Sequence, residues 1–334
     1  MPPRGGGMEI IMNNTYTPEG GLITTQANRE YISSVHGLER AMLQGKILEA
    51  YATLCDGSYT LHVDLGDVQG YIERDECVYS PTNETVKDIA IITRVGKPVC
   101  FKVMHIESIG ERTVAFLSRR SAQKECYDYY LSDLISGDII PAKITHLESF
   151  GAFADIGCGI PSLLSIDCIS VSRISHPSDR LAVGHNIHAV VKSIDRSNGR
   201  IFLSLRELLG TWLENTSLFK VGSTVSGIIR SVESYGVFIE LAPNLAGLAE
   251  LRDTKFSQSV ISSHIGARAA VYIKSIIPER MKVKLVLIDC SCEKENVPPL
   301  RYHVDTRRVR HIDRWLYSPP SCEKIIESVF EKGC

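Results

Sequence analysis

Short runs of alternating apolar and polar residues recur along most of this chain. Residues 138–146 and 224–231 alternate in this way, and so do the segments RIFLSL at 200–205 and KVKLVL at 282–287. Gly- and Asn-containing turn signals separate the runs, as at Gly157-Cys158-Gly159 and Ser197-Asn198-Gly199. A period of two between such turns is typical of short β-strands. The pattern therefore predicts an all-β chain.

The strands belong to a repeated unit. The segment GAFADIG at 151–157 returns as GVFIEL at 236–241, and an aromatic residue, Phe150 or Tyr235, precedes each copy. Each copy has a strand before it and three after it. A weaker copy begins at LHVDLGDVQGYIERDE, residues 61–76. The repeat predicts three tandem five-stranded β-barrels joined by short helical connectors.

The repeat also sets the expected domain boundaries. An amphipathic helix is expected over 28–43, with Tyr31, Val35, Leu38 and Met42 on one face, and we assign it to docking. The predicted parts are an N-terminal tail with this helix (1–44), a divergent first barrel (45–120), a helical linker (121–136), the second barrel (137–206), a linker (207–220), the third barrel (221–289) and a basic tail (290–334).

Strand parity indicates which side chains face outward. If alternate residues fill the barrel interior, their neighbours must face solvent. The expected interior residues are Ala152, Ala154, Ile156, Val237, Ile239 and Leu241, and the expected outward ones are Phe153, Asp155, Phe238 and Glu240. Phe150 and Tyr235 fall on the opposite face by strict alternation, but a bulge at Gly151 or Gly236 would bring each next to its partner ring.

The closing strands add cations to these outward rings. Parity leaves Arg200 outward in the second unit and Lys282 and Lys284 outward in the third. Rings that stack on bases, next to cations that hold phosphates, suit single-stranded nucleic acid. The alternative is that the exposed rings pack against a neighbouring barrel, since exposed aromatic residues often mark protein contacts.

SFGAFADIG together with VKSIDRSNGRIFLSL resembles the S1 RNA-binding domain, a barrel of the OB-fold class. The resemblance is strong over 137–208, good over 221–288 and weak over 45–118. It implies three OB-fold barrels of the S1 type. In that family the RNA surface comprises the two aromatic residues of the FGAF motif, a histidine after the third strand, and an Asp and an Arg around the final turn.

The resemblance implies site residues position by position. The second barrel has the most complete set: Phe150, Phe153, Ser165 at the histidine position, Asp195 and Arg200. The third barrel has Tyr235, Phe238 and Lys282, but Glu250 at the histidine position and Pro278 at the aspartate position. The first has Tyr59 and His62 at the aromatic positions and Glu73 for histidine, which suits a protein contact better.

The C-terminal segment RYHVDTRRVRHIDR, residues 301–314, is a local basic patch that includes Arg308 and Arg310, and Trp315 and Tyr317 follow it. It is either an RNA or ribosome contact or a segment folded back on the third barrel. Cys290, Cys292, His303, His311 and Cys322 lack the compact spacing of a structural zinc site, so we expect no metal and no cofactor.

Composition and the absence of catalytic motifs exclude several classes of function. The net charge of −2 excludes a protein that coats duplex DNA by bulk electrostatics, because that affinity needs many Lys and Arg residues. The ten cysteines form no CxxC pair, and no apolar run approaches the roughly 18 residues of a membrane span. We therefore expect a cytoplasmic protein with reduced thiols. No P-loop, HExxH, GxSxG or dinucleotide motif is present, so no catalysis and no small-molecule substrate are expected.

The leading hypothesis is an RNA-binding protein of the small-ribosomal-subunit type that holds single-stranded mRNA during translation. The family resemblance implies the ribosome as partner. The alternatives are an RNA-binding accessory subunit of an RNA decay or processing machine, and an adaptor that binds only protein.

Overall fold

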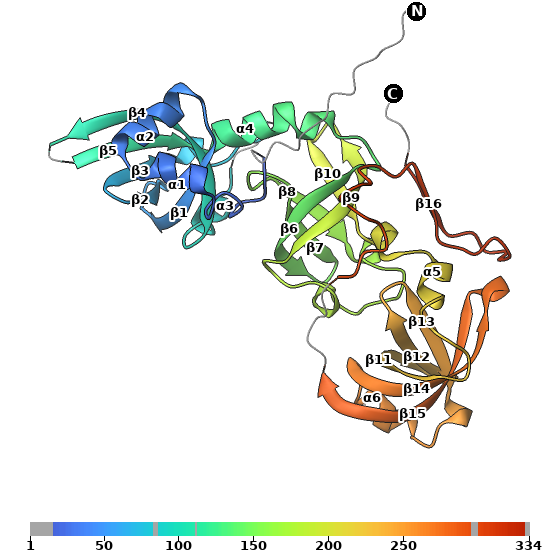
Figure 1. Ribbon diagram of the computed structural model, residues 1–334. Helices are drawn as coiled ribbons and strands as arrows, with labels where there is room; N and C mark the ends of the chain where they lie inside the picture. The colour runs from blue at the N-terminus through green and yellow to red at the C-terminus, as the bar shows by residue number, and fades with distance from the viewer. Residues whose placement is uncertain (1–15, 83–85, 111, 295–299, 331–334) are drawn as a thin grey trace, which may run out of the picture. The chain divides into compact units, whose positions relative to one another are not determined.

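Three five-stranded sheets close into barrels (Figure 1). The computed structural model describes residues 16–82, 86–110, 112–294 and 300–330. Barrel 1 has the order β1-β2-β3-β5-β4, barrel 2 the order β10-β8-β7-β6-β9 and barrel 3 the order β11-β12-β13-β15-β14. The strands are β1 Leu48–Cys55, β2 Leu61–Leu65, β3 Val68–Ile72, β4 Pro98–Ile109, β5 Arg112–Ser118, β6 Ile139–Glu148, β7 Gly151–Asp155, β8 Pro161–Ser165, β9 Asn186–Asp195, β10 Arg200–Ser204, β11 Thr224–Glu233, β12 Gly236–Ala242, β13 Leu245–Glu250, β14 Ala267–Ile277 and β15 Lys282–Lys294.

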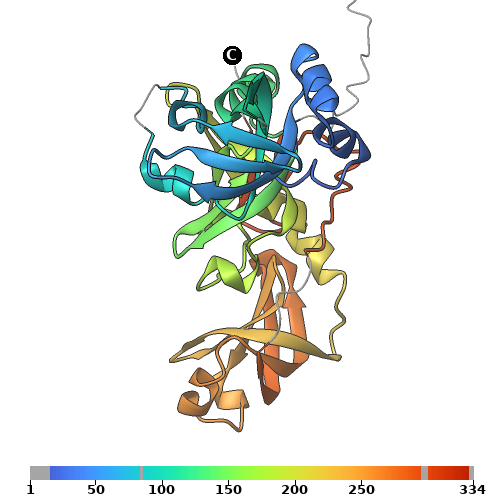
Figure 2. The ribbon, with the colours of Figure 1, turned by 90° about the vertical axis from the view of Figure 1, so that its left-hand side faces the viewer.

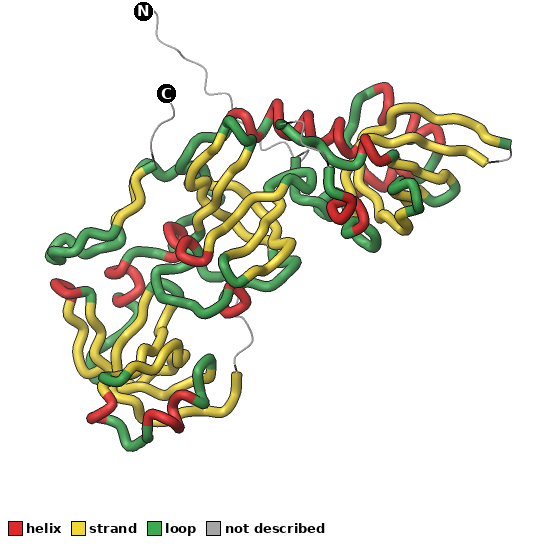
Figure 3. The backbone as a smooth tube through the Cα atoms, turned by 180° about the vertical axis from the view of Figure 1, so that it is seen from behind, coloured by secondary structure: helices red, strands yellow, loops and turns green. Residues whose placement is uncertain are grey.

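Two compact units contain these barrels. Unit 1 comprises the residues up to Asp133 together with Asp155–Ile160, and unit 2 comprises Leu134–Ala154 and Pro161 onward. Barrel 1 therefore lies in unit 1, whereas barrel 3 and nearly all of barrel 2 lie in unit 2. Both units consist mainly of strands, and the helices that connect the strands are short (Figure 3).

The cores follow the predicted parity. In β2 the alternate residues Leu61, Val63 and Leu65 are buried, as are Ala152 and Ala154 in β7. The same alternation buries Ile201, Leu203, Leu205, Val237, Ile239, Val283, Leu285 and Leu287. The chain is thus mostly β and built on five-stranded barrels, as predicted, although Leu241, expected inside, is only half-buried.

The single helix predicted over 28–43 is wrong. Two helices, α1 Gln26–Ile32 and α2 Val35–Leu43, occupy the segment because Ser34 adopts an extended conformation and its side chain caps α2 by accepting from Gly37 N. Leu38 and Ala41 are fully buried in the core of barrel 1. Figure 2 shows both helices beside that barrel. The segment is therefore part of the packing of barrel 1 and not a free docking element.

Short helices also occupy the connectors. α4, Arg119–Tyr129, follows barrel 1, and α5, Trp212–Thr216, follows barrel 2. A reciprocal capping box between Thr211 and Glu214 begins α5. The remaining helices are α3 Asp88–Ile92 and α6 Gln258–Ser262. Within the described ranges no helix has the length and apolarity that crossing a membrane would require.

The C-terminal segment folds back on unit 2. It forms the hairpin β16 Arg314–Leu316 and β17 Glu327–Val329, and Trp315 and Tyr317 are buried in the core of barrel 3. Upstream, the segment lies along barrel 2, where Ile139 N donates to Arg310 O at 2.8 Å. The segment is folded back, as one of the two alternatives had it, but its basic part contacts barrel 2 rather than the third barrel. Trp315 and Tyr317 are core residues of barrel 3. Arg308 and Arg310 remain exposed.

Candidate nucleic-acid interface

Two aromatic rings lie next to each other at the β6–β7 turn of barrel 2. Phe150 is in the turn and is 54% exposed, and Phe153 is half-buried in β7. Their ring centroids are 6.1 Å apart and the ring planes meet at 88°. Ala152 and Ala154 on either side of Phe153 are fully buried, so Phe153 faces outward.

Barrel 3 repeats this geometry. Tyr235 is 60% exposed in the β11–β12 turn, and its ring centroid lies 6.2 Å from that of Phe238 at an interplanar angle of 88°. Val237 and Ile239 are buried on either side of Phe238. The same edge-to-face pair therefore stands at the same place in two barrels, with open ring surface for a stacking ligand.

The predicted pairing of the rings is confirmed, but the predicted bulge at the glycine is not its cause. Each leading aromatic residue lies in the hairpin turn, where strand alternation does not apply. The glycines instead allow the neighbouring strand to approach closely. A Cβ at Gly151 would lie 2.5 Å from Leu164 O, and one at Gly236 would lie 2.8 Å from Ala249 O. The register shift of β11 against β12 falls elsewhere, between Ile229 and Ser231.

A third outward position extends each patch; the sequence identified it in barrel 3, as Lys284, but Phe202 in barrel 2 was missed. In barrel 3, Phe238 pairs in register with Leu248, and Leu248 with Lys284. In barrel 2 the residue at the Lys284 position is Phe202, which is half-buried and pairs with Leu163. Parity within RIFLSL, where Ile201 and Leu203 point inward, was the signal that could have found it.

Cations surround the rings. Arg200, Lys282 and Lys284 are exposed, as the closing-strand pattern predicted. The sequence analysis did not identify Lys192 of β9 and Lys274 of β14, although the two lysines occupy positions equivalent to each other in barrels 2 and 3. The Lys192 ammonium lies 3.1 Å from Cys168 Sγ, and that of Lys274 lies 3.2 Å from Asp253 Oδ2. We call Phe150, Phe153, Phe202, Lys192 and Arg200 the barrel 2 patch, and Tyr235, Phe238, Lys274, Lys282 and Lys284 the barrel 3 patch.

The remaining barrel 2 candidates are engaged with their neighbours. Asp195 accepts hydrogen bonds from the Ser197 hydroxyl at 2.6 Å and the Asn198 amide at 2.7 Å, and these lower its pKa to about 2. It thereby orders the turn that precedes Arg200. Ser165 Oγ donates to Asp167 and lowers the pKa of that carboxyl. In barrel 3, Glu250 forms an ion pair with Arg252.

Barrel 1 does not reproduce the ring pair at its candidate positions. Tyr59 has a left-handed backbone, with φ of +61°, and its ring lies under the guanidinium of Arg74, 5.2 Å away. His62 lies in β2, where its Nε2 is 3.3 Å from Asp56 Oδ2. The two residues thus have separate partners, unlike Phe150 and Phe153.

The outward placement predicted for Asp155 and Glu240 is wrong. Both carboxylates are buried, with exposures of 3% and 4%. Parity failed here because polar partners, rather than water, satisfy these side chains. Glu240 accepts from Arg180 at 2.5 and 2.9 Å and from Arg230 at 2.7 Å, within unit 2.

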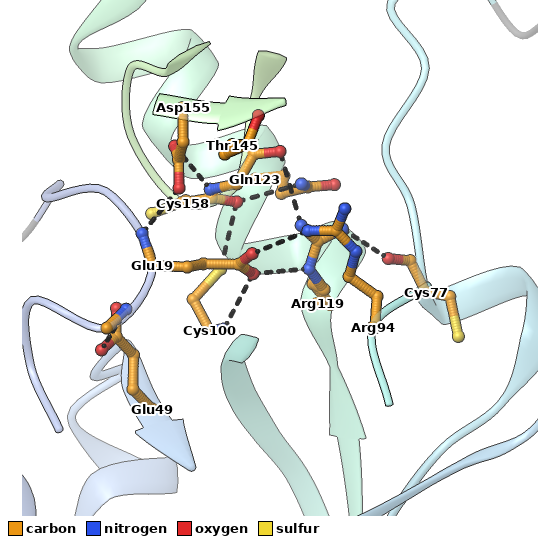
Figure 4. A network of polar contacts seen from close by, with 12 residues as sticks. Glu19, Glu49, Cys77, Arg94, Cys100, Arg119, Gln123, Thr145, Asp155 and Cys158 are labelled. Atoms are coloured by element: carbon orange, nitrogen blue, oxygen red, sulfur yellow. Dashed lines mark hydrogen bonds and ion pairs between the residues drawn. The ribbon is translucent and has the colours of Figure 1, made fainter. Parts of the chain in front are cut away.

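Asp155 joins a buried network in unit 1 (Figure 4). Its Oδ2 accepts from Glu19 N at 2.6 Å, and its Oδ1 accepts from the backbone of Gly157 and Gly159. The Glu19 carboxylate in turn accepts from Arg119 Nε at 2.7 Å, and it forms an ion pair with Arg94. Burial would raise the pKa of Glu19, but these two guanidinium groups lower it. Within unit 1, the chain before α1 is thereby tied to Asp155 and the loop that follows it.

Glu49 in β1 provides a test of electrostatics in unit 1. Burial and the charge of Glu19 raise its pKa to about 7, despite three backbone N–H groups that donate to it. A carboxyl whose pKa is higher in the folded protein than in the unfolded chain contributes its full stability below about pH 4.3, the pKa of an unfolded Glu. That contribution is lost as the pH rises to 7. Glu49→Gln, which stays neutral, should therefore gain stability relative to wild type between pH 5 and pH 8, by up to about 3 kcal/mol.

Denaturant unfolding at the two pH values measures this difference. The Glu30→Gln variant is the control, because Glu30 is an exposed acid on α1. A Glu49→Gln variant that loses stability relative to wild type at pH 8 would contradict the prediction, since it would mean that the three backbone donors keep Glu49 ionised.

No gathered metal-ligand set appears in the part of the chain that the structure describes. The side chain of Cys292, one of the five residues considered for zinc, lies outside the described residues.

Comparison with known proteins identifies the domain type. Residues 133–206 match the family model of the S1 RNA binding domain. Small ribosomal subunit protein bS1 of Staphylococcus aureus (strain COL) is 27% identical over 276 residues, which cover 81% of this chain and 65% of the relative. The bS1 homolog of Bacillus subtilis (strain 168) is 30% identical over 207 residues, which cover 60% of this chain and 50% of the relative. The predicted resemblance to the S1 family is confirmed.

The chain thus spans between half and two thirds of the length of these curated relatives. Among solved structures, the complex of a/eIF2alpha, aDim2p and rRNA from Pyrococcus horikoshii OT3 matches at 24% identity, over 25% of this chain and 50% of that chain, with a TM-score of 0.22.

Proposed function

Because residues 133–206 carry an S1 RNA-binding domain, we propose that this protein binds single-stranded RNA through the barrel 2 and barrel 3 patches. The observation that supports the proposal best is the ring pair repeated with the same separation and angle in two barrels. Each exposed ring offers a stacking surface worth about 1–3 kcal/mol per base. Lys192, Arg200 and Lys282 supply charge for the phosphates.

We further propose that all three barrels are S1-type OB folds and that the RNA is mRNA held at the small ribosomal subunit in the cytoplasm. The names of the curated relatives support the ribosomal role. In this proposal the protein acts by binding and carries out no chemical step.

Removing the Phe153 or Phe238 ring should weaken RNA binding by about 1–3 kcal/mol per ring while costing far less stability than a core substitution. Titration of a labelled single-stranded oligonucleotide against Phe153→Ala and Phe238→Ala measures the first effect, and thermal unfolding measures the second. Tyr129→Ala is the control, because Tyr129 is 73% exposed on α4, outside both patches.

Unchanged affinity in both variants would refute the proposed interface. Cosedimentation of the wild-type protein with purified small subunits tests the ribosomal part separately. RNA binding without cosedimentation would leave an RNA-binding accessory subunit, and absence of both would leave a protein adaptor.

A further inference from the structure

Among the residues that the structure describes, barrel 1 alone carries an aromatic row across four strands. His62 of β2 pairs in register with Tyr71 of β3, Tyr71 with Phe116 of β5, and Phe116 with His105 of β4. Successive ring centroids along this row are 4.8, 6.4 and 4.3 Å apart, and His105 stacks on Phe116 with ring planes 10° apart. We call these four residues the barrel 1 ladder.

The ladder faces outward. The strand neighbours of His62 and Phe116 point into the barrel: Leu61, Val63, Ala115 and Leu117 are all buried. The His105 side chain is 53% exposed and that of His62 is 31% exposed, while Tyr71 and Phe116 are half-buried. A ligand can therefore reach a row of rings across four strands.

At the positions that carry cations in the other two patches, the described residues of barrel 1 are apolar. His105 pairs with Phe116 as Ser193 pairs with Phe202 and Ser275 with Lys284, so the three barrels can be compared position by position. On this register Met104 stands at the position of Lys192 and Lys274, and Val114 stands at the position of Arg200 and Lys282. Met104 is 51% exposed, whereas Val114 is buried.

Carboxylates surround the ladder instead. Asp56 Oδ2 lies 3.3 Å from His62 Nε2, and Glu107 Oε1 lies 3.4 Å from His105 Nε2. Asp64 is exposed two residues beyond His62 on the same strand. The exposed cation of β5, Arg112, pairs in register with Ile109 at the far end of the β4–β5 hairpin. Phosphates would meet acids at this face, whereas a cation would meet both acids and ring faces.

We propose that the barrel 1 ladder binds an arginine-bearing polypeptide segment. A guanidinium stacks on aromatic faces and also pairs with carboxylates through its planar donors. The ladder supplies the rings, and Asp56, Asp64 and Glu107 beside it supply the carboxylates. Lysine offers a compact charge without the planar face, so it should bind less well. This surface goes beyond the proposed RNA function, because its partner is a protein and its residues lie outside the two RNA patches.

The test uses the full chain and a labelled ten-residue peptide of alternating Gly and Arg, with a Gly-Lys peptide of the same length and charge as comparison. Fluorescence anisotropy at pH 8, where free imidazole is neutral, gives both affinities. The Arg peptide should bind several-fold more tightly than the Lys peptide. His105→Ala should weaken Arg peptide binding about five-fold, as expected for loss of one cation–π contact of about 1 kcal/mol. Asp64→Asn should also weaken it.

Two matched controls should leave the affinity unchanged. His36→Ala removes a histidine of α2 that is 86% exposed and lies 3.8 Å from Glu39, and Glu233→Gln neutralises an exposed acid of barrel 3. Equal affinity for the two peptides, or a loss as large in the controls as in His105→Ala, would overturn the proposal.

RNA binding is measured on the same variants. The single-stranded oligonucleotide should bind His105→Ala and wild type equally well. If His105→Ala weakens RNA and the Arg peptide does not bind, the ladder is an RNA face and the proposal fails. Failure of the proposed RNA function would appear separately, as unchanged RNA affinity in Phe153→Ala and Phe238→Ala.

Discussion

Replacing Arg180 with methionine should lower the free energy of unfolding of unit 2 by about 3–5 kcal/mol, the usual cost of leaving one member of a buried ion pair without its partner. Arg180 follows β8 of barrel 2 and is 2% exposed, and both of its Nη atoms donate to Glu240 of barrel 3. Arg230 also donates to Glu240, so in the variant the buried carboxylate would keep one of its two guanidinium partners.

Urea unfolding of Arg180→Met and of Arg314→Met provides the measurement. The control residue Arg314 pairs with Glu327, but its side chain is 59% exposed, so its loss should cost less than about 1 kcal/mol. Equal losses in the two variants would mean that the buried pair contributes no more than an exposed one.

The double variant Arg180→Met/Glu240→Leu should recover part of the loss, because it removes both charges instead of stranding one. No recovery would point to the packing of the two side chains, rather than their charges, as the origin of the effect.

Truncating Trp315 to alanine should destabilise barrel 3 by about 3–5 kcal/mol, as expected for deleting a large buried ring. Trp315 lies in β16, 6% exposed, and it packs in the barrel 3 core with Tyr317, 5.5 Å away between ring centroids. Leu316→Ala is the matched control, because Leu316 follows directly and is 37% exposed.

Thermal unfolding followed by tyrosine and tryptophan fluorescence and by circular dichroism reports the effect. A Trp315→Ala variant as stable as Leu316→Ala would show that barrel 3 reaches full stability without this segment.

Much of the fold was predictable because the barrel interior imposes a period of two. Ala152 and Ala154 required an outward Phe153, and the same argument placed Phe238 between Val237 and Ile239. Parity, however, reports only which face of a strand a residue occupies. It cannot report what covers that face.

The misplacement of Asp155 and Glu240 follows from that limit. Their partners, Glu19 and Arg180, lie 136 and 60 residues from them along the chain, and no local pattern announces such a pairing. The break between α1 and α2 did have a local signal, because Ser34 is a favourable N-cap before Val35. Trp315 and Tyr317 suggested a surface patch because they follow a basic run, whereas only the tertiary structure places them in a core.

The docking of the C-terminal segment along barrel 2, where His311 Nδ1 lies within hydrogen-bond distance of Asp138 Oδ1, has a consequence for folding kinetics. It joins residues 173 positions apart at 2.8 Å, and the core of barrel 3 receives Trp315 and Tyr317 from beyond that point. Contacts of such sequence separation form late, because the entropy of closing the intervening loop must be overcome first. During synthesis barrels 2 and 3 emerge before the segment that completes them. We therefore expect the last step of refolding to be the docking of residues 301–330, and expect it to be slower than closure of the barrels themselves.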